Sequence, residues 1–374
     1  MKILIVNDCG LRGSGAEIRI RLLVEELLKR QTYSEIHVLE HETSSTKFQG
    51  VTIHRCSTQN SGFVTAHIIK KNSIDLVQVH NLASISTRPI IAAKKLKKPV
   101  LFFLHDYWPL CGRRYLYSKW NTSCSETQAF KCMRCIGIPS YIHVLRTRKD
   151  LNKCDVGIAP STFCKELYEH HGLLRGKWQV VTPWIDKIFN LPLKKEVNRE
   201  QNRILFVGPL SKAKGAYLLA EAFAEVKKVF PETKLYYVGY GQEKTNQERT
   251  QLEQLFQDTG ILHAVSFLGE KTSEQLKEEY ARAGVYVCCP LWPEVFGQTW
   301  AQALACGAPV VATNVGSIPE LSSSVVIVNS TPISLAQGII QVLKEQKREK
   351  RQSWLEVQNV IGTLEKIYQE FISF

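Results

Sequence analysis

The chain opens with Lys2-Ile-Leu-Ile-Val-Asn7, a short run rich in Ile and Val, and a glycine-containing loop follows over residues 10–15. Such a run is typical of a strand that is buried on both faces of a sheet. From Glu17 to Arg30, apolar residues recur at mostly helical spacing. The opening therefore predicts a strand, a loop and a helix, which together form the first unit of a parallel α/β sheet.

The same alternation continues along the chain. Strand-length apolar runs in the first half lie at Glu35–Leu39, Leu76–His80, Val100–His105 and Val156–Ala159. A second series lies at Arg203–Gly208, Leu235–Gly239, Val265–Leu268, Val285–Cys289 and Val310–Thr313. Because strands that alternate with helical segments favour parallel sheets, we predict two doubly wound domains. Ligands of such domains bind outside the carboxyl ends of the strands.

Residues 183–202 carry prolines and charges without periodicity, which is typical of a linker. We therefore predict an N-terminal domain over 1–185 and a C-terminal domain over 186–352. Residues 353–374 have apolar side chains at helical spacing and are expected to form an amphipathic terminal helix.

The charge is distributed unevenly. The chain has 374 residues, with 48 Lys+Arg and 35 Asp+Glu, for a net charge of +13. Residues 1–185 hold 27 basic and 14 acidic residues, while the remainder holds 21 of each. This excludes a histone-like or ribosomal distribution and predicts an anionic partner for the first domain, with nucleic acid the less favoured candidate.

Clusters at Lys70–Lys71, Lys94–Lys98 and Arg146–Lys149 supply much of this excess. Each is most simply a solvated surface cluster. Together with Trp108, Trp120 and Trp178 they are also suited to binding anionic lipid.

The location of the protein is suggested by what the sequence lacks. The N-terminal run is too short for a signal peptide, and no run reaches the ~20 apolar residues of a membrane span. Eleven cysteines without an export signal favour a reducing compartment. We expect a cytoplasmic protein and leave open a peripheral position on the inner face of the membrane.

The most specific string runs from Pro290 to Thr313. It places Glu294 in a loop after a predicted strand and predicts a helix over 297–306. The N–H groups and dipole at the start of a helix favour an anionic or hydroxyl-rich ligand. A carboxylate on this loop can accept hydrogen bonds from sugar hydroxyls.

This string resembles the donor site of family 4 glycosyltransferases of the GT-B fold, whose pattern is Glu, seven residues, Glu, a small-residue helix and Gly-x-Pro-Val-Val-Ala. The second Glu, which contacts the nucleotide ribose in the family, is Gln302 here. The string Leu205–Gly215 resembles the family's Gly-Arg-Leu and Lys-Gly segment. Lys214 matches its lysine, whereas Pro209 replaces the arginine, so either Lys212 substitutes or the enzyme has one cation fewer.

Two strings in the first half continue the resemblance. Gly13-Ser14-Gly15-Ala-Glu17 is similar to the family's Gly-Gly-Ala-Glu loop, which approaches the donor phosphates and the acceptor. Leu104-His105-Asp106-Tyr107 ends a predicted strand, and the family's matching His reaches the donor sugar. Asp106 is expected to contact the acceptor or to hold His105, and Tyr107 lies on the same acceptor side.

The resemblance implies a GT-B fold, in which two Rossmann-like domains face a cleft and the terminal helix packs back on the first domain. It implies a retaining transfer, without a catalytic metal, from a nucleotide diphosphate sugar bound by the second domain. The positive charge of the first half, and not the resemblance, favours a lipid-linked, polysaccharide or glycolipid hydroxyl as the acceptor. The implied catalytic residues are His105, Lys214 and Glu294. The implied donor-binding residues are Gly13, Ser14, Gly15, Gly208, Lys212, Lys214, Gly239, Lys271, Glu294, Phe296, Gly297, Gln298 and Gln302.

Two other functions stay open. One is another GT-B chemistry, such as that of a sugar-nucleotide epimerase. The other is a catalytically weak, basic, zinc-containing binding protein, which the replacements at Gln302 and Pro209 favour.

Cys111, Cys124, Cys132 and Cys135 fall in a mostly polar segment, 107–140, that departs from most of the family. Four thiolates are the ligand set of a structural zinc site. The same set also suits an iron–sulfur cluster, and unrelated cysteines are the third alternative. We expect this insertion to influence the choice of acceptor.

Overall fold

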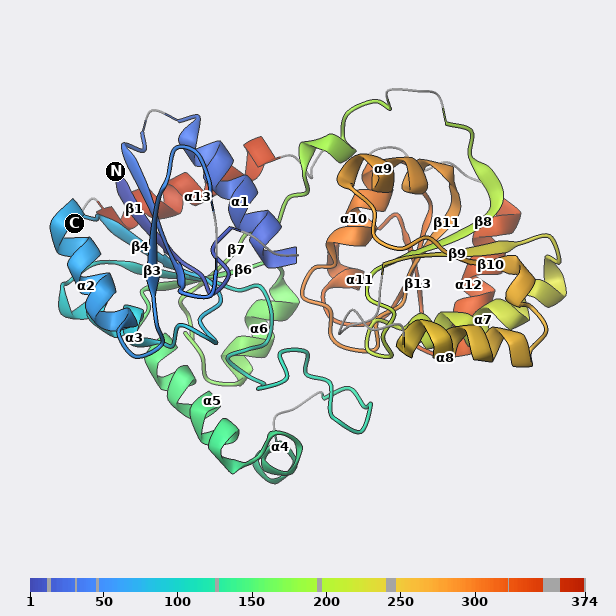
Figure 1. Cartoon of the computed structure of the whole chain (residues 1–374), viewed down its shortest axis with the longest axis horizontal. Helices are drawn as coiled ribbons and strands as arrows, with labels where there is room; N and C mark the ends of the chain where they lie inside the picture. The colour runs from blue at the N-terminus through green and yellow to red at the C-terminus, as the bar shows by residue number, and fades with distance from the viewer. Residues whose placement is uncertain are drawn as a thin grey trace. The chain divides into compact units, whose positions relative to one another are not determined.

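The computed structural model describes residues 1–11, 15–30, 32–44, 47–124, 128–193, 197–239, 247–321, 323–345 and 357–372. The chain divides into two compact units (Figure 1). Unit 1 comprises Met1–Leu116, Cys124–Trp184 and Val357–Phe374. Unit 2 comprises Tyr117–Ser123 and Ile185–Glu356.

Unit 1 is built on a seven-stranded sheet in the order β3-β2-β1-β4-β5-β6-β7, and all neighbouring strands are parallel. The order reverses at β1, which pairs with both β2 and β4. The strands are β1 (Lys2–Val6), β2 (Glu35–His41), β3 (Thr52–Cys56), β4 (Leu76–Val79), β5 (Val100–Phe103), β6 (Val156–Ala159) and β7 (Trp178–Val180).

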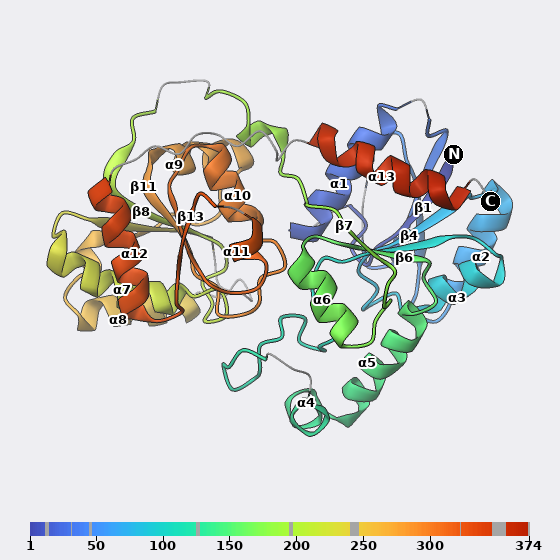
Figure 2. The same cartoon turned by 180° about the vertical axis from the view of Figure 1, so that it is seen from behind.

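The described helices of unit 1 are α1 (Gly15–Leu28), α2 (Ser61–Asn72), α3 (Arg88–Lys95), α4 (Ala129–Ile136), α5 (Ile138–Leu151), α6 (Thr162–His170) and α13 (Val357–Ile372). Figure 2 shows α13 lying across unit 1 beside α1. Its residues Ile361, Leu364 and Tyr368 are buried in the same core as β1 and α1. Arg30 and Glu365 form an ion pair of 2.6 Å next to this contact. The last helix of the chain therefore completes the core of unit 1.

Unit 2 has a six-stranded parallel sheet in the order β10-β9-β8-β11-β12-β13. Its strands are β8 (Glu200–Val207), β9 (Lys234–Val238), β10 (Val265–Phe267), β11 (Ala283–Cys288), β12 (Val310–Thr313) and β13 (Val325–Val328). Its described α-helices are α7 (Ala216–Val229), α8 (Gln247–Asp258), α9 (Ser273–Arg282), α10 (Gln298–Ala305), α11 (Ile318–Leu321) and α12 (Pro332–Glu345). Two buried clusters include side chains of its central strands β8 and β11, one cluster with α7 and α12 and the other with α10.

The predicted fold class, two doubly wound parallel α/β sheets, is confirmed. Three strands were missed in the sequence: β3, β7 and β13. β3 and β7 lie at an edge of their sheet and have one buried residue each, so their sequences carry little apolar signal. The division between the units falls after Trp184, and the predicted linker already contains the first residues of β8. Within the described residues, no helix is long and apolar enough to span a membrane.

Candidate active site

Each sheet has one place where the strand order reverses, between β1 and β4 in unit 1 and between β8 and β11 in unit 2. At such a point the connections leave toward opposite faces, and a crevice opens at the carboxyl ends of the strands. Glu294 and Lys214 follow β11 and β8 at this edge of unit 2. Asn7 and His80 directly follow β1 and β4 in unit 1.

The centre of the unit 2 site is an ion pair between Lys214 and Glu294, with 2.9 Å between Nζ and Oε2. The Glu294 side chain is nearly buried, and the Lys214 ammonium lies 4.6 Å from the ring centre of Trp292. Both charged residues line a cavity with Gly208 and Thr299. The structure thus brings together the two residues that the sequence predicted as a catalytic cation and carboxylate.

Two glycines fix the position of this pair. Gly215, directly after Lys214, has φ of +80°, and a Cβ atom there would lie 1.7 Å from the carbonyl oxygen of Cys289. A Cβ atom on Gly316 would lie 2.2 Å from the carbonyl oxygen of Glu294. The hydroxyl of Ser317 donates to that same carbonyl at 3.0 Å. Only glycine permits these approaches, so the Lys214 and Glu294 loops are held against rigid neighbours.

The other residues predicted for the donor fall into three groups. Gly208, Gly297, Gln298 and Gly239 lie in the loops and helix start around the pair; a Cβ atom on Gly239 would lie 2.1 Å from the oxygen of Gly208. Lys212 and Lys271 lie outside the set of residues that line the described cavity. The Phe296 ring packs against Trp300 in the core, so the predicted donor contact by this residue would have to be made by its backbone.

Gln302, on the second turn of α10, is engaged within unit 2. Its Oε1 accepts a hydrogen bond from the hydroxyl of the buried Tyr280, at 3.1 Å. A primary amide has one oxygen acceptor group and one –NH2 donor group. With the oxygen bonded to Tyr280, the –NH2 is the group that suits a ligand atom with a lone pair.

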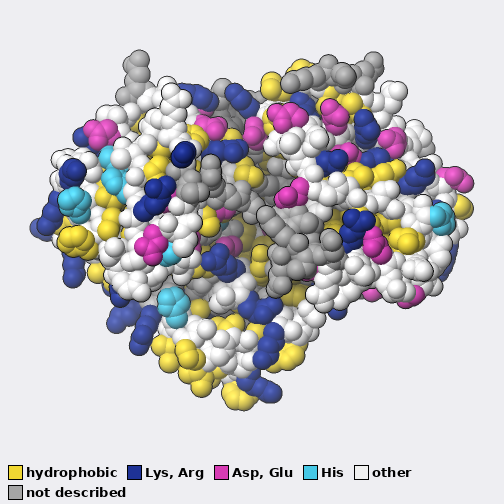
Figure 3. Space-filling view, in the orientation of Figure 1, with side chains coloured by type: hydrophobic (Ala, Val, Ile, Leu, Met, Phe, Trp, Pro, Cys, Tyr) yellow, Lys and Arg dark blue, Asp and Glu magenta, His cyan; other side chains and the backbone are white. Residues whose placement is uncertain are grey.

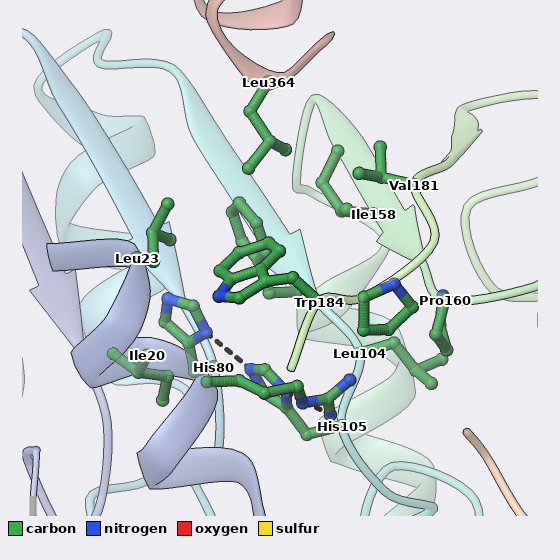
Figure 4. Close-up of a pocket in the computed structure, with 13 residues that line it drawn as sticks. Ile20, Leu23, His80, Leu104, His105, Ile158, Pro160, Val181, Trp184 and Leu364 are labelled. Atoms are coloured by element: carbon green, nitrogen blue, oxygen red, sulfur yellow. Dashed lines mark hydrogen bonds between the residues drawn. The ribbon is translucent and has the colours of Figure 1, made fainter. Parts of the chain in front are cut away.

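Unit 1 contains a row of three nitrogen side chains at the ends of β4 and β5 (Figure 4). Arg19 Nη2 lies 2.7 Å from His105 Nδ1, and His105 Nε2 lies 2.7 Å from His80 Nδ1. Because arginine only donates, Nδ1 of His105 accepts and its Nε2–H donates to His80. The row therefore assigns the proton of each imidazole to Nε2.

Burial keeps both imidazoles neutral. It lowers the pKa of His80 to about 3, and the charge of Arg19 adds to this. The pKa of His105 is also lowered well below its usual value, first by burial and then by Arg19 and His80. Since both ring nitrogens of His105 are bonded within unit 1, a direct bond from this ring to a sugar requires one of the two to open.

A mostly apolar cavity lies next to this row, and Trp184 and Leu364 are among the residues that line it (Figure 4). Within the described part of the chain, the buried Nε2 of His80 and Nε1 of Trp184 have no hydrogen-bond partner. Both atoms belong to residues that line the cavity. The cavity therefore suits a hydrogen-bond acceptor, such as the oxygen of an ordered water.

The side chains of Asp106 and Tyr107 have different surroundings. Asp106 Oδ1 accepts a hydrogen bond from the Trp108 N–H at 2.8 Å, and burial raises the pKa of this carboxyl to about 6. The Tyr107 side chain is completely buried and its ring stacks on Tyr168, so the predicted acceptor contact by Tyr107 stays a prediction that requires this side chain to move. Its aromatic ring holds the loop that carries Asp106.

Sequence analysis missed Arg19, His80 and Asp8. Asp8 is buried, and its carboxylate accepts hydrogen bonds from the backbone N–H groups of Ser84 and Ile85, at 3.0 and 2.9 Å. The sequence could have indicated Asp8 and His80, because polar residues directly follow an apolar strand at both Asn7-Asp8 and His80-Asn81. Of the predicted loop, Gly13 and Ser14 lie outside the described residues, and Gly15 begins α1 with open space around its Cα.

The predicted metal site is not confirmed. Within the described ranges, no group of three or more His, Cys, Asp or Glu side chains is arranged to hold a metal ion. Cys111, Cys124, Cys132 and Cys135 are all half-buried. Burial raises the pKa of the Cys124 thiol, and the nearby thiols of the other three add to this. The four residues are therefore electrostatic neighbours without being a preformed ligand set.

Comparison with known families assigns the chain. Residues 13–187 match the model of "Glycosyltransferase Family 4", and residues 189–356 match "Glycosyl transferases group 1". The chain is a family 4 glycosyltransferase of the GT-B fold. The predicted family and enzyme class are confirmed.

Solved structures agree with the fold of this glycosyltransferase. Anabaena Alr3699/HepE, in complex with UDP and glucose, has a TM-score of 0.67 and 16% identity, covering 100% of this chain and 95% of that one. The lipopolysaccharide outer core galactosyltransferase WaaB has a TM-score of 0.61 and 14% identity, with coverage of 100% and 97%.

Curated relatives match over shorter segments. An uncharacterized glycosyltransferase of Methanocaldococcus jannaschii, MJ1607, is 28% identical over 226 residues, which are 59% of this chain and 55% of the relative. A D-inositol 3-phosphate glycosyltransferase of Corynebacterium jeikeium is 37% identical over 116 residues, 30% of this chain and 27% of the relative. The chain thus spans about half or less of the length of these two relatives.

Proposed function

We propose that this glycosyltransferase moves a sugar from a nucleotide diphosphate sugar, bound by unit 2, to a hydroxyl of an acceptor bound by unit 1. The observation that carries the proposal is the pair of Lys214 and Glu294 at the point where the strand order of unit 2 reverses. The solved structures of HepE with UDP and with UDP-glucose support a nucleotide-sugar donor.

In this proposal the two side chains act on different parts of the donor. The ammonium of Lys214 stabilises the negative charge that develops on the diphosphate as it leaves. The carboxylate of Glu294 accepts hydrogen bonds from hydroxyls of the donor sugar. From the resemblance to the family we expect no catalytic metal and retention of the anomeric configuration.

The acceptor side is proposed on charge. The first 185 residues carry the whole surplus of +13. An anionic acceptor fits this surplus best, and we propose a lipid-linked, polysaccharide or glycolipid hydroxyl. Polar residues lie at the ends of β1, β4 and β5, and they include Asp8 and Asp106. Their carboxyl groups can accept a hydrogen bond from the hydroxyl of an acceptor.

The test is a thermal-shift panel of nucleotides and nucleotide sugars on the full chain, followed by an assay of nucleotide release with the sugar donor that stabilises most. Stabilisation by one nucleotide class, lost in Lys214→Met, supports the proposal. If neither nucleotides nor nucleotide sugars raise the melting temperature, the donor site is wrongly assigned. Epimerisation of the donor without an acceptor would favour the alternative GT-B chemistry.

We further propose that Cys111, Cys124, Cys132 and Cys135 close around a structural zinc ion once metal is supplied. Neighbouring thiols of this set raise the pKa of Cys124 and of Cys132. Helix α4, which carries two of the four cysteines, has no buried side chain. A loop with so little core gains order from a metal. Elemental analysis of chain purified without chelator tests this, and a zinc content well below one per chain overturns it.

A further inference from the structure

One face of α5 is apolar and exposed. Ile138, Ile142 and Leu145 follow one another at spacings of four and three residues, and all three side chains are exposed. At 3.6 residues per turn, these positions form a single stripe along the helix. Lys149, four residues further, continues the stripe and ends it with a positive charge.

The opposite side of α5 is fixed in unit 1. Val144, Thr147 and Leu151 are its buried residues, and they lie on roughly the other side of the helix. The guanidinium of Arg148 donates hydrogen bonds to the backbone oxygens of Pro109 and Leu110, at 3.2 and 3.1 Å. The exposed stripe is therefore presented on a helix that is held in place from behind.

The neighbouring helix α4 adds to this face. It packs against α5, and no residue in it is buried. Phe130 is 70% exposed, the second highest value among the exposed large apolar side chains of the described residues. The guanidinium carbon of Arg134 lies 5.8 Å from the centre of the Phe130 ring. An aromatic ring flanked by a cation is thus placed on the surface that continues the α5 stripe.

The charges on this face have one sign. From Ala129 to Lys149 there are five Lys and Arg residues and no Asp or Glu. Apart from Arg148, these cations are exposed: Lys131, Arg134, Arg146 and Lys149. Among the described residues, none of the four forms an ion pair with a carboxylate. Hydrophobic and basic side chains gather at this end of unit 1 (Figure 3).

We propose that this face, made of Phe130, Ile138, Ile142, Leu145 and the four exposed cations, docks on a lipid bilayer with anionic headgroups. Apolar side chains enter the boundary of the acyl chains while Lys and Arg remain among the headgroups. A second copy of the chain would place the same positive charges against each other, which opposes self-association through this face. An anionic bilayer offers acyl chains to the apolar stripe and negative headgroups to the cations around it.

The structure keeps one of the basic clusters that the sequence suggested for lipid binding, because Arg146 and Lys149 lie on this face, but it changes the apolar part of that suggestion. Trp108 and Trp178 are buried in unit 1 and cannot reach a membrane. Lys94 is bound to Asp155 in an ion pair of 2.7 Å. On α4 and α5, by contrast, the side chains of Phe130, Ile138, Ile142 and Leu145 are exposed. Docking by this face is independent of which donor the enzyme uses and of whether the acceptor is a lipid.

The test is flotation of the full chain with vesicles of phosphatidylcholine alone and of phosphatidylcholine mixed with phosphatidylglycerol. We expect binding to the anionic vesicles only, weakened by added salt. Changing Lys131, Arg134, Arg146 and Lys149 to Gln is expected to lower the partition coefficient on the order of a hundredfold. Changing Ile142 and Leu145 to Ser tests the apolar part and is expected to lower it on the order of tenfold.

A matched control uses the exposed residues of α2, namely Phe63→Ser with Lys70→Gln and Lys71→Gln. This control removes one aromatic ring and two cations elsewhere on unit 1 and is expected to retain most of the binding. Circular dichroism and thermal melting confirm that each variant is folded. Absence of binding to anionic vesicles, or equal losses in the control, overturns the proposal. So does a dimer in sedimentation that the Ile142 and Leu145 changes abolish, because the face then belongs to a second copy.

Discussion

His105 Nε2 donates a hydrogen bond to His80 Nδ1 across 2.7 Å, while Arg19 occupies the other ring nitrogen of His105. The two bonds together select one tautomer of His105 and fix the plane of its ring. The imidazole that resembles the family's donor-sugar histidine is therefore positioned by two residues that no sequence motif indicated. His80 and Arg19 are positioning residues for His105.

Replacement of His80 by Phe removes this acceptor. The Phe ring keeps much of the volume and can still stack on Phe103, whose ring centre lies 4.8 Å away. We expect a loss of about 1–3 kcal/mol in the free energy of unfolding, because the His105 N–H loses its partner in a buried place. We also expect kcat to fall more than KM changes. Chemical denaturation and steady-state kinetics measure the two effects.

His80→Asn is the matched variant, because the Asn side-chain oxygen can occupy the place of the histidine Nδ1 and accept the same hydrogen bond. It is expected to recover part of the kcat that His80→Phe loses. Equal losses in kcat by both variants would show that the site needs the histidine ring itself rather than the acceptor atom.

The ion pair of Lys214 and Glu294 leads to a second prediction. Lys214→Met is expected to lower kcat on the order of a hundredfold or more, because the leaving diphosphate loses a positioned cation. Glu294→Gln keeps the shape and is expected to cost less in nucleotide binding than in sugar transfer. Nucleotide affinity by calorimetry separates the two variants. Lys212→Met is the control on the same loop, and a loss equal to that of Lys214→Met would move the diphosphate contact to Lys212.

The strands could be predicted only in part, and their order could not be predicted. The apolar runs at β1 and β11 are buried at every residue except Lys2, so composition alone marks them. The edge strand β3 is largely exposed or half-buried, and its sequence carries little apolar signal. Strand order depends on which runs pair in space, a property that the local sequence does not contain.

Site residues could be predicted where the motif that marks them lies in one continuous segment. Glu294 and Lys214 could be found because their strings resemble a family pattern and each lies in one continuous segment. The Arg19, His80 and His105 row joins three segments that are 25 to 86 residues apart. Its hydrogen bonds depend on the side-by-side packing of β4, β5 and α1. A motif gives neighbours in sequence but not the direction of a side chain, so the burial of the Tyr107 and Phe296 side chains could not be predicted.

Asp106 makes stability depend on pH. Its pKa is raised from 3.8 in the unfolded chain to about 6 in the folded one, mainly by burial. The folded state therefore holds this proton more tightly, so the contribution is favourable below about pH 4 and is lost as pH rises through 6. We expect Asp106→Asn, which keeps an oxygen for the Trp108 N–H, to be more stable than the parent at pH 8 by about 1–3 kcal/mol. The advantage should vanish toward pH 4. Urea denaturation at both pH values measures the difference in free energy of unfolding between variant and parent. The same difference at pH 4 and pH 8 would show that the pKa of Asp106 is not raised.

Gln302 leads to the last prediction, because its Oε1 already accepts a hydrogen bond from Tyr280 and its –NH2 can only donate. Gln302→Glu restores a second oxygen acceptor at this position, so one carboxylate oxygen can keep the Tyr280 hydroxyl while the other accepts from a hydroxyl of the nucleotide ribose. A hydrogen bond to a charged group contributes about 1.5–3 kcal/mol, so we expect nucleotide affinity to rise by roughly tenfold or more. Tyr280→Phe in the Gln302 parent frees the amide oxygen and is expected to give a smaller gain in the same direction. Calorimetric titration with the nucleotide measures both. A weaker affinity in Gln302→Glu would show that the amide –NH2 of Gln302 donates a hydrogen bond to the nucleotide.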